Sequence, residues 1–153
     1  HGTVANTGIV TIIPYPNLTN LVLASVLPIK RNVIWYARKS LEQGPIVQVT
    51  QCPGIEIECG PKSSDEIKIK LEEVLSGVLN RITNWNLNEL IENLKGKEFY
   101  YVFCNKRGNS NTYADFTLAR DKDGEFYPFL SNQYPGISCY KMRKISFENF
   151  YIY

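Results

Sequence analysis

Residues that commonly transfer protons are sparse in this chain. Its 153 residues include a single histidine, His1. No internal histidine can therefore serve as the base of a Ser-His-Asp or Cys-His site. An N-terminal histidine suggests a copper site, but such a site needs a second histidine beside it. We therefore interpret His1 as a processing or tag remnant.

Carboxylates are the next candidates for chemistry. Paired carboxylates act as acid and base in glycosidases, but carboxylates at strand ends are usually solvated. No glycine-rich phosphate-binding loop occurs, so nucleotide binding through such a loop has no support and no cofactor is predicted. The acidic residues that lie in or beside predicted strands, and could converge, are Glu56, Glu58, Glu98, Asp115 and Glu125.

Basic and aromatic residues alternate in two regions that follow predicted strands. Such residues can hold single-stranded RNA by pairing with phosphates and stacking on bases. A turn with solubilising charges over packed tyrosines would give the same pattern. The residues of this candidate RNA or partner surface are Tyr100, Lys106, Arg107, Tyr113, Tyr140, Lys141 and Arg143.

Cysteine usage indicates an oxidising compartment. Cys52, Cys59, Cys104 and Cys139 contain no C-x-x-C pair, and the usual Cys/His zinc spacings are absent, so no metal site is predicted. An even number of cysteines indicates one or two disulfides, and the sequence cannot choose among the three full pairings. Together with a glycosylation triplet at 17–19, this predicts a secreted protein.

Composition predicts one globular domain over residues 1–153. Hydrophobic residues make up 44% of the chain and charged residues 21%, values typical of a folded protein. The 17 basic and 15 acidic residues give a net charge of +2, which excludes a nucleic-acid binder that works by bulk charge. The longest apolar stretch, 18–29, is too short to cross a bilayer. We expect a monomer.

Several strands are predicted around one long helix. Runs at 9–13, 32–37, 46–50, 98–104, 113–120 and 125–130 are of β type, and 137–153 closes the chain with one or two strands. Residues 121–124 are a hairpin turn. The run at 21–27 is read as a strand, with a helix as the alternative.

The long helix is predicted over 64–82, and a short one over 87–94. Ser64 is the expected N-cap, and Asp65 and Glu66 suit the first turn. Apolar residues from Ile67 to Ile82 form one continuous stripe, which we expect to pack on the sheet. The fold class is therefore α+β, with one main helix on an antiparallel sheet.

Part of this pattern resembles the small fungal guanyl-specific ribonucleases. Cys59-Gly60, the Ser63-Ser64-Asp65 helix start and the strands at 114–118 and 126–132 are similar to that family's motifs. The resemblance implies a curved ribonuclease-like sheet over 59–153 with a β-rich extension at 1–58. It also implies a Cys59–Cys139 disulfide. Phe116 stands where the family has its arginine, and its catalytic histidine is missing.

A ribonuclease shape without ribonuclease residues resembles the secreted effectors of powdery-mildew fungi. Their aromatic strand ending in Asn-Lys-Arg-Gly is similar to 98–108 here. The resemblance implies a virulence protein without enzymatic activity that enters a plant cell, binds a host protein or RNA, and is detected by an immune receptor. The alternatives are an active secreted hydrolase, with Glu98 and Arg107 or Arg120 as its residues, and an unrelated binding module.

Overall fold

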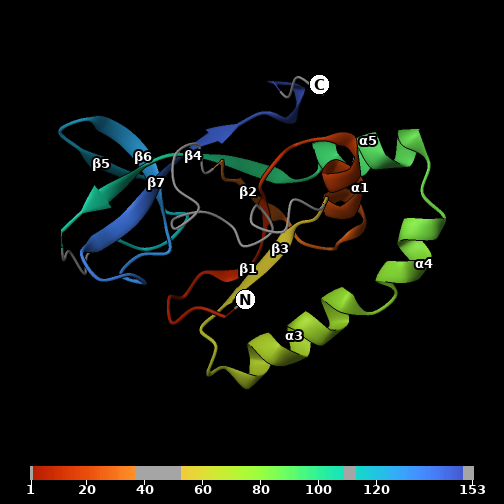
Figure 1. Cartoon of the computed structure of the whole chain (residues 1–153), viewed down its shortest axis with the longest axis horizontal. Helices are drawn as coiled ribbons and strands as arrows, with labels where there is room; N and C mark the ends of the chain where they lie inside the picture. Colours follow the sequence, from red (N-terminus) through yellow and green to blue (C-terminus); the bar gives the residue numbers. More distant parts are fainter. Residues whose placement is uncertain (1, 37–52, 109–112, 150–153) are drawn as a thin grey trace.

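The computed structural model describes residues 2–36, 53–108 and 113–149, and within them a seven-stranded mixed sheet (Figure 1). The strand order is β3-β1-β2-β4-β7-β6-β5. The strands are β1 Gly8–Ile13, β2 Arg31–Ile34, β3 Glu56–Gly60, β4 Glu98–Arg107, β5 Ala119–Asp121, β6 Gly124–Phe129 and β7 Ile137–Ile145.

Parallel and antiparallel pairs divide this sheet into two halves. β1 and β2 are parallel, as are β2 and β4, whereas β3 runs antiparallel to β1 at one edge. β4, β7, β6 and β5 are joined in antiparallel pairs. The prediction of one helix on an antiparallel ribonuclease-like sheet is therefore wrong. Residues 1–58 are not an extension either, because they supply β1, β2 and most of β3.

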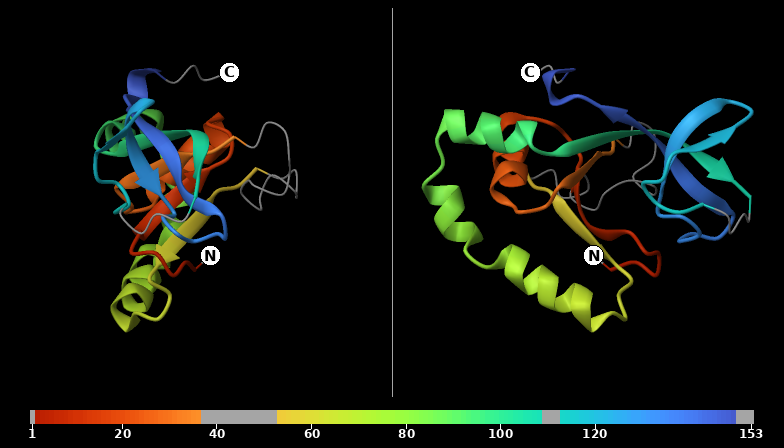
Figure 2. Two further views of the ribbon diagram at one scale, coloured as in Figure 1. Left: turned by 90° about the vertical axis from the view of Figure 1, so that its left-hand side faces the viewer. Right: turned by 180° about the vertical axis from the view of Figure 1, so that it is seen from behind.

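The two faces of the sheet carry separate apolar cores. Val10, Ile12, Val33 and Trp35 pack on one face with residues of the antiparallel half. Side chains of alternate positions, such as Ile13 and Ile34, point to the opposite face, as the period of two in a strand requires. Helices α1 (Leu18–Val26) and α5 (Leu87–Lys95) cover that second face, as the two views in Figure 2 show.

Residues 18–26 form a helix because Asn17 caps it: the Asn17 side chain accepts a hydrogen bond from the Asn20 backbone N–H. This bears out the helical alternative for the 21–27 run and not the strand. The short helix predicted over 87–94 is confirmed as α5, capped in the same way by Asn86.

The predicted long helix is two helices, α3 (Asp65–Leu75) and α4 (Val78–Thr83). Ser64 caps α3 as expected, accepting from the Ile67 N–H. Gly77 has φ 71°, a left-handed conformation that ends the helical ladder. The predicted apolar stripe does not pack on the sheet along its length, because Val74 is buried but Leu79 is 79% exposed.

The remaining predicted strands are confirmed in part. β6 and the 121–124 turn occur where expected, but only the end of the predicted 113–120 strand is β5. Phe116 has φ 61°, which a strand does not allow. The predicted strand at 46–50 lies outside the described residues. As expected, none of the described helices is long and apolar enough to span a membrane.

Candidate functional site

The most unusual ionisable group in the structure lies on the edge strand β3. Glu58 is 2% exposed, and it pairs with Val10 of β1. Directly opposed residues of an antiparallel pair project from the same face, so Glu58 lies on the face of Val10, Ile12 and Trp35. Glu56 projects from this face as well, two residues earlier and opposite Ile12.

Burial changes the acidity of Glu58. Loss of hydration is the main reason that the pKa of Glu58 rises from the ordinary 4.5 to about 7, and the nearby negative charge of Glu56 contributes to this rise. A carboxyl group of this kind is divided between its acid and its carboxylate form at neutral pH. It can therefore accept a proton and return it within one reaction cycle.

Tyrosines lie beside these carboxylates. The pKa of Tyr134 is raised by burial and by the negative charges of Glu58 and Glu56, which places its phenol within their electrostatic reach. The Tyr134 ring meets the Tyr140 ring edge-on, with centroids 6.0 Å apart. Tyr140 in turn packs against Trp35 at 4.4 Å. The two carboxylates and this aromatic wall together form the candidate site.

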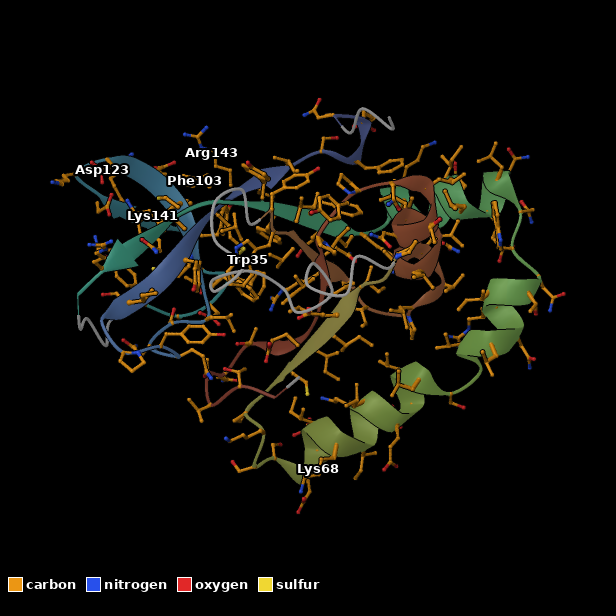
Figure 3. The ribbon with its side chains drawn as sticks, in the orientation of Figure 1. Trp35, Lys68, Phe103, Asp123, Lys141 and Arg143 are labelled. Atoms are coloured by element: carbon orange, nitrogen blue, oxygen red, sulfur yellow. The ribbon has the colours of Figure 1, made fainter. Side chains whose placement is uncertain are left out.

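Tyr140 remains a hydrogen-bond donor under all physiological conditions. Burial raises its pKa to about 12, and the neighbouring Tyr134 adds to the shift. A phenol that keeps its proton can donate to a carbonyl or carboxylate oxygen of a bound molecule. Trp35, on which Tyr140 packs, lies near the middle of the molecule (Figure 3).

The chain segment at 2–7 joins the edge strand to the loop that carries Tyr134. Thr3 is fully buried, and its backbone N–H donates to the Cys59 carbonyl at 2.9 Å. Its hydroxyl donates to the Gln133 side chain, which also accepts from the Val4 N–H at 3.0 Å. The position of Tyr134 is therefore tied to β3 through residues next to it in sequence.

That loop holds backbone strain. Leu130 and Asn132 have φ of 51° and 57°, left-handed values that are uncommon for residues other than glycine. Asp115 stabilises this conformation, because its carboxylate accepts from the N–H groups of Leu130 and Ser131 at 3.1 and 3.0 Å. The Thr7 hydroxyl donates to the same carboxylate at 2.8 Å. Strain of this kind is often found at functional sites.

Gly60 lets the N-terminal segment pass directly against β3. A Cβ atom at this position would lie 2.3 Å from the Ala5 carbonyl oxygen and 2.4 Å from a methyl carbon of Thr3. No side chain fits there without moving the backbone. The glycine is thus required by the close approach of the N-terminal segment to β3.

Within 2–36, 53–108 and 113–149, no three His, Cys, Asp or Glu side chains converge as metal ligands. Gly2 forms an isolated parallel bridge with Cys59, next to Glu58, but His1 itself lies outside the described residues.

The structure separates the predicted basic and aromatic surface into different roles. Lys106 and Lys141 both pair with Asp121, at 2.6 and 2.8 Å, so these cations neutralise an internal charge (Figure 3 labels Lys141). Tyr113 packs on Phe126 beside them. Of the predicted residues, Tyr140 is brought to the candidate site.

The other three predicted residues lie elsewhere. Tyr100 is 3% exposed, with its hydroxyl on Glu98. Arg143 lies over the Phe103 ring at 4.8 Å, as Figure 3 shows, and Arg107 is the last residue of β4.

The predicted carboxylates also divide. Glu56 and Glu58 come together on β3, but Glu98 lies on β4 within reach of Lys30, Arg31 and Lys144. The Glu125 carboxylate pairs with Arg120 at 2.7 Å. The sequence-based candidates included Glu58 but not Tyr134, because a Tyr-Pro-Gly sequence is typical of a turn and carries no chemical signal.

The implied Cys59–Cys139 disulfide is absent. Cys59 is on β3 and Cys139 is on β7, with β1, β2 and β4 between them in the sheet. Cys104 is exposed and Cys139 is buried, both as thiols. The fourth cysteine, Cys52, lies outside the described residues.

Comparison with solved structures shows which proteins share this fold. Murine aminoacylase 3 superposes with a TM-score of 0.69 over 95% of this chain at 17% identity. Succinylglutamate desuccinylase from Chromobacterium violaceum gives a TM-score of 0.54 over 94% of this chain at 15% identity. The fold is that of these two enzymes. This chain spans 61% and 52% of their respective lengths.

No protein-family model matches the sequence, and neither does any curated protein. The structural likeness corrects the ribonuclease-like fold that the sequence suggested. The two neighbours are named as an aminoacylase and a desuccinylase, and neither is ribonuclease-like. The prediction of a ribonuclease-like fungal effector without activity is therefore wrong, as is the virulence role that the resemblance implied.

Proposed function

We propose that this chain carries the acid–base part of a hydrolase that removes an acyl group from an amino compound. The observation that supports this most is the buried Glu58 carboxyl, with its pKa of about 7, on the face that carries Tyr134 and Tyr140. The two structural neighbours, named as an aminoacylase and a desuccinylase, suggest the acyl–amino bond as the target.

In the proposed reaction, the Glu58 carboxylate removes a proton from a water molecule. The hydroxide forms a bond to the acyl carbon, and the electron pair of the C=O bond moves to its oxygen. As the carbonyl re-forms, the C–N bond breaks and Glu58 returns its proton to the nitrogen. The products are a carboxylic acid and an amine. The phenols of Tyr140 and Tyr134 would donate hydrogen bonds that hold the substrate oxygens.

The test is an assay of hydrolysis of N-acetyl amino acids and of N-succinylglutamate. The released free amine is the quantity measured. We expect turnover whose pH profile rises through about 7, because the carboxylate form of Glu58 is the active base. Glu58→Gln should lower kcat at least about 100-fold. Glu125→Gln changes an exposed carboxylate of the β5–β6 hairpin and should keep normal turnover. An unchanged rate in Glu58→Gln would refute the proposal.

A further inference from the structure

A cavity lies on the opposite face of the sheet from Glu58. It has a volume of about 500 Å³ and is lined by the end of α1, by α4, by the α4–α5 connection and by α5. One of its lining residues, Leu90, packs with Ile13 and Ile34, which project from the face that α1 and α5 cover. Cavities of a few hundred Å³ are the usual size for small-molecule sites.

Two cations line this cavity. Lys97 is half-buried and donates to the carbonyl oxygens of Leu27 and Ile29, at 2.6 and 2.8 Å, and Arg81 contacts the Val26 carbonyl at 3.4 Å. Within the described part of the chain, neither cation forms an ion pair with a carboxylate. Burial without a counter-charge lowers the pKa of Lys97 to about 8.

The acidic residue at the cavity does not neutralise them. Glu89 is exposed, and its carboxylate accepts from the Asn86 side chain at 3.1 Å. Leaving a partly buried ammonium ion without a counter-charge is unfavourable, so an anion in the cavity would be stabilised there. The guanidinium of Arg81 adds donors whose geometry suits a carboxylate.

An exposed aromatic ring also lines this cavity. Trp85 lies in the α4–α5 connection, lines the cavity and is 40% exposed. Its indole N–H makes no hydrogen bond to any residue that the structure describes. A large aromatic surface that stays open to solvent beside two cations provides contact area for the apolar part of a ligand.

We propose that this cavity is a binding site for a small organic carboxylate, whose apolar group packs on Trp85 and whose anionic group contacts Arg81 and Lys97. The site is separate from Glu58 and does not depend on the proposed hydrolase activity.

Benzoate is the probe for this site, and benzamide is its uncharged counterpart. The chain has two tryptophans, so a ¹⁵N-labelled sample gives two indole N–H signals in an NMR spectrum, and Trp85→Phe assigns them. We expect benzoate to shift the Trp85 signal saturably and to leave the Trp35 signal in place. Benzamide should bind at least about tenfold more weakly because it lacks the charge.

Charge variants decide whether the two cations bind the probe. Arg81→Gln and Lys97→Gln should each weaken benzoate binding about tenfold, the loss of one charge-assisted hydrogen bond. Lys95→Gln changes an exposed cation that pairs with Glu92 and should bind benzoate normally. Arg81→Gln carries the test if Lys97→Gln fails to fold. A static Trp85 signal, equal binding of benzamide, or unchanged binding in Arg81→Gln would overturn the proposal.

Discussion

At the scale of single residues, Glu58 shows how a fold can change an ordinary side chain. The same carboxyl on an exposed strand would titrate near 4.5, but at 2% exposure it does so at about 7. Burial disfavours the charged form, so Glu58 keeps its proton to a higher pH in the folded protein than in the unfolded chain. Folding must therefore become less favourable as the pH rises and Glu58 ionises.

The sign of this effect gives a stability prediction. Between pH 4.5 and about 7 the folded state binds more protons at Glu58 than the unfolded state, so the free energy of unfolding falls as pH rises. The shift corresponds to about 3 kcal/mol, at about 1.4 kcal/mol for each pH unit. Urea unfolding across this range should show the loss in the wild type and not in Glu58→Gln.

Glu125→Gln is the control for that comparison, since its exposed carboxylate should leave the wild-type pH dependence intact. A Glu58→Gln protein that loses stability with pH as steeply as the wild type would contradict the assigned burial effect.

Residue identity alone could nominate Glu58 but not choose it. It was one of five acidic residues in or beside predicted strands, and sequence gives no measure of which carboxylate is buried. The choice came from β3 pairing with β1 and from the N-terminal segment that packs over Gly60. These contacts join parts of the chain at least 44 residues apart, which no local pattern contains.

At the scale of elements, the β5–β6 hairpin is held to the sheet by charge. Asp121 accepts from both Lys106 of β4 and Lys141 of β7, and these contacts lower the pKa of Asp121. The Lys141 side chain is 6% exposed, so Asp121 offsets a buried positive charge.

Replacing Asp121 with asparagine should therefore be costly. Asp121→Asn leaves Lys141 with only the more exposed Asp123 carboxylate, and we expect a loss of unfolding free energy that is clearly larger than that of an exposed ion pair. Chemical denaturation measures this loss. Glu125→Gln, which breaks the exposed pair with Arg120, should cost under about 0.5 kcal/mol. Equal effects of the two changes would refute a structural role for Asp121.

Elements were predictable where their signals are local. Capping by Ser64, the short helix over 87–94 and the hairpin turn at 121–124 depend on neighbouring residues, and these were predicted correctly. The helix over 64–82 was predicted as continuous because its apolar spacing is continuous. The left-handed conformation of Gly77 interrupts the helix, and the spacing of the apolar residues gives no sign of this interruption.

At the scale of the whole molecule, α3 is weakly attached. Of its residues only Val74 is buried, whereas six residues of α1 are buried. Figure 1 shows α3 along the outside of the molecule, away from the antiparallel half of the sheet. Local opening of a helix costs little when few apolar contacts are lost.

Hydrogen exchange should reveal this difference. Backbone amides of α3 should exchange at least about 100-fold faster than those of α1, since α1 opens only with the sheet that it covers. Mass spectrometry of peptides covering 65–75 and 18–26 measures both in one sample. Equal protection of the two helices would show that α3 packs more firmly than its contacts indicate.

The topology itself could not be read from the sequence. Runs of apolar residues correctly indicated β1, β2, β4 and β6. Such runs do not indicate which strands are neighbours in the sheet or whether neighbouring strands are parallel. β2 and β4 are adjacent and parallel although more than 60 residues separate them. The helix followed by strands was therefore compatible with a ribonuclease-like sheet as well as with the mixed sheet observed.

The central claim is that Glu58 is a buried acid divided between its two forms at neutral pH. Its side-chain carboxyl carbon can be followed by NMR in a ¹³C-glutamate-labelled sample, with the signal assigned by its loss in Glu58→Gln. We expect the Glu58 signal to titrate with a pKa of about 7. A midpoint near the ordinary value of 4.5 would contradict it.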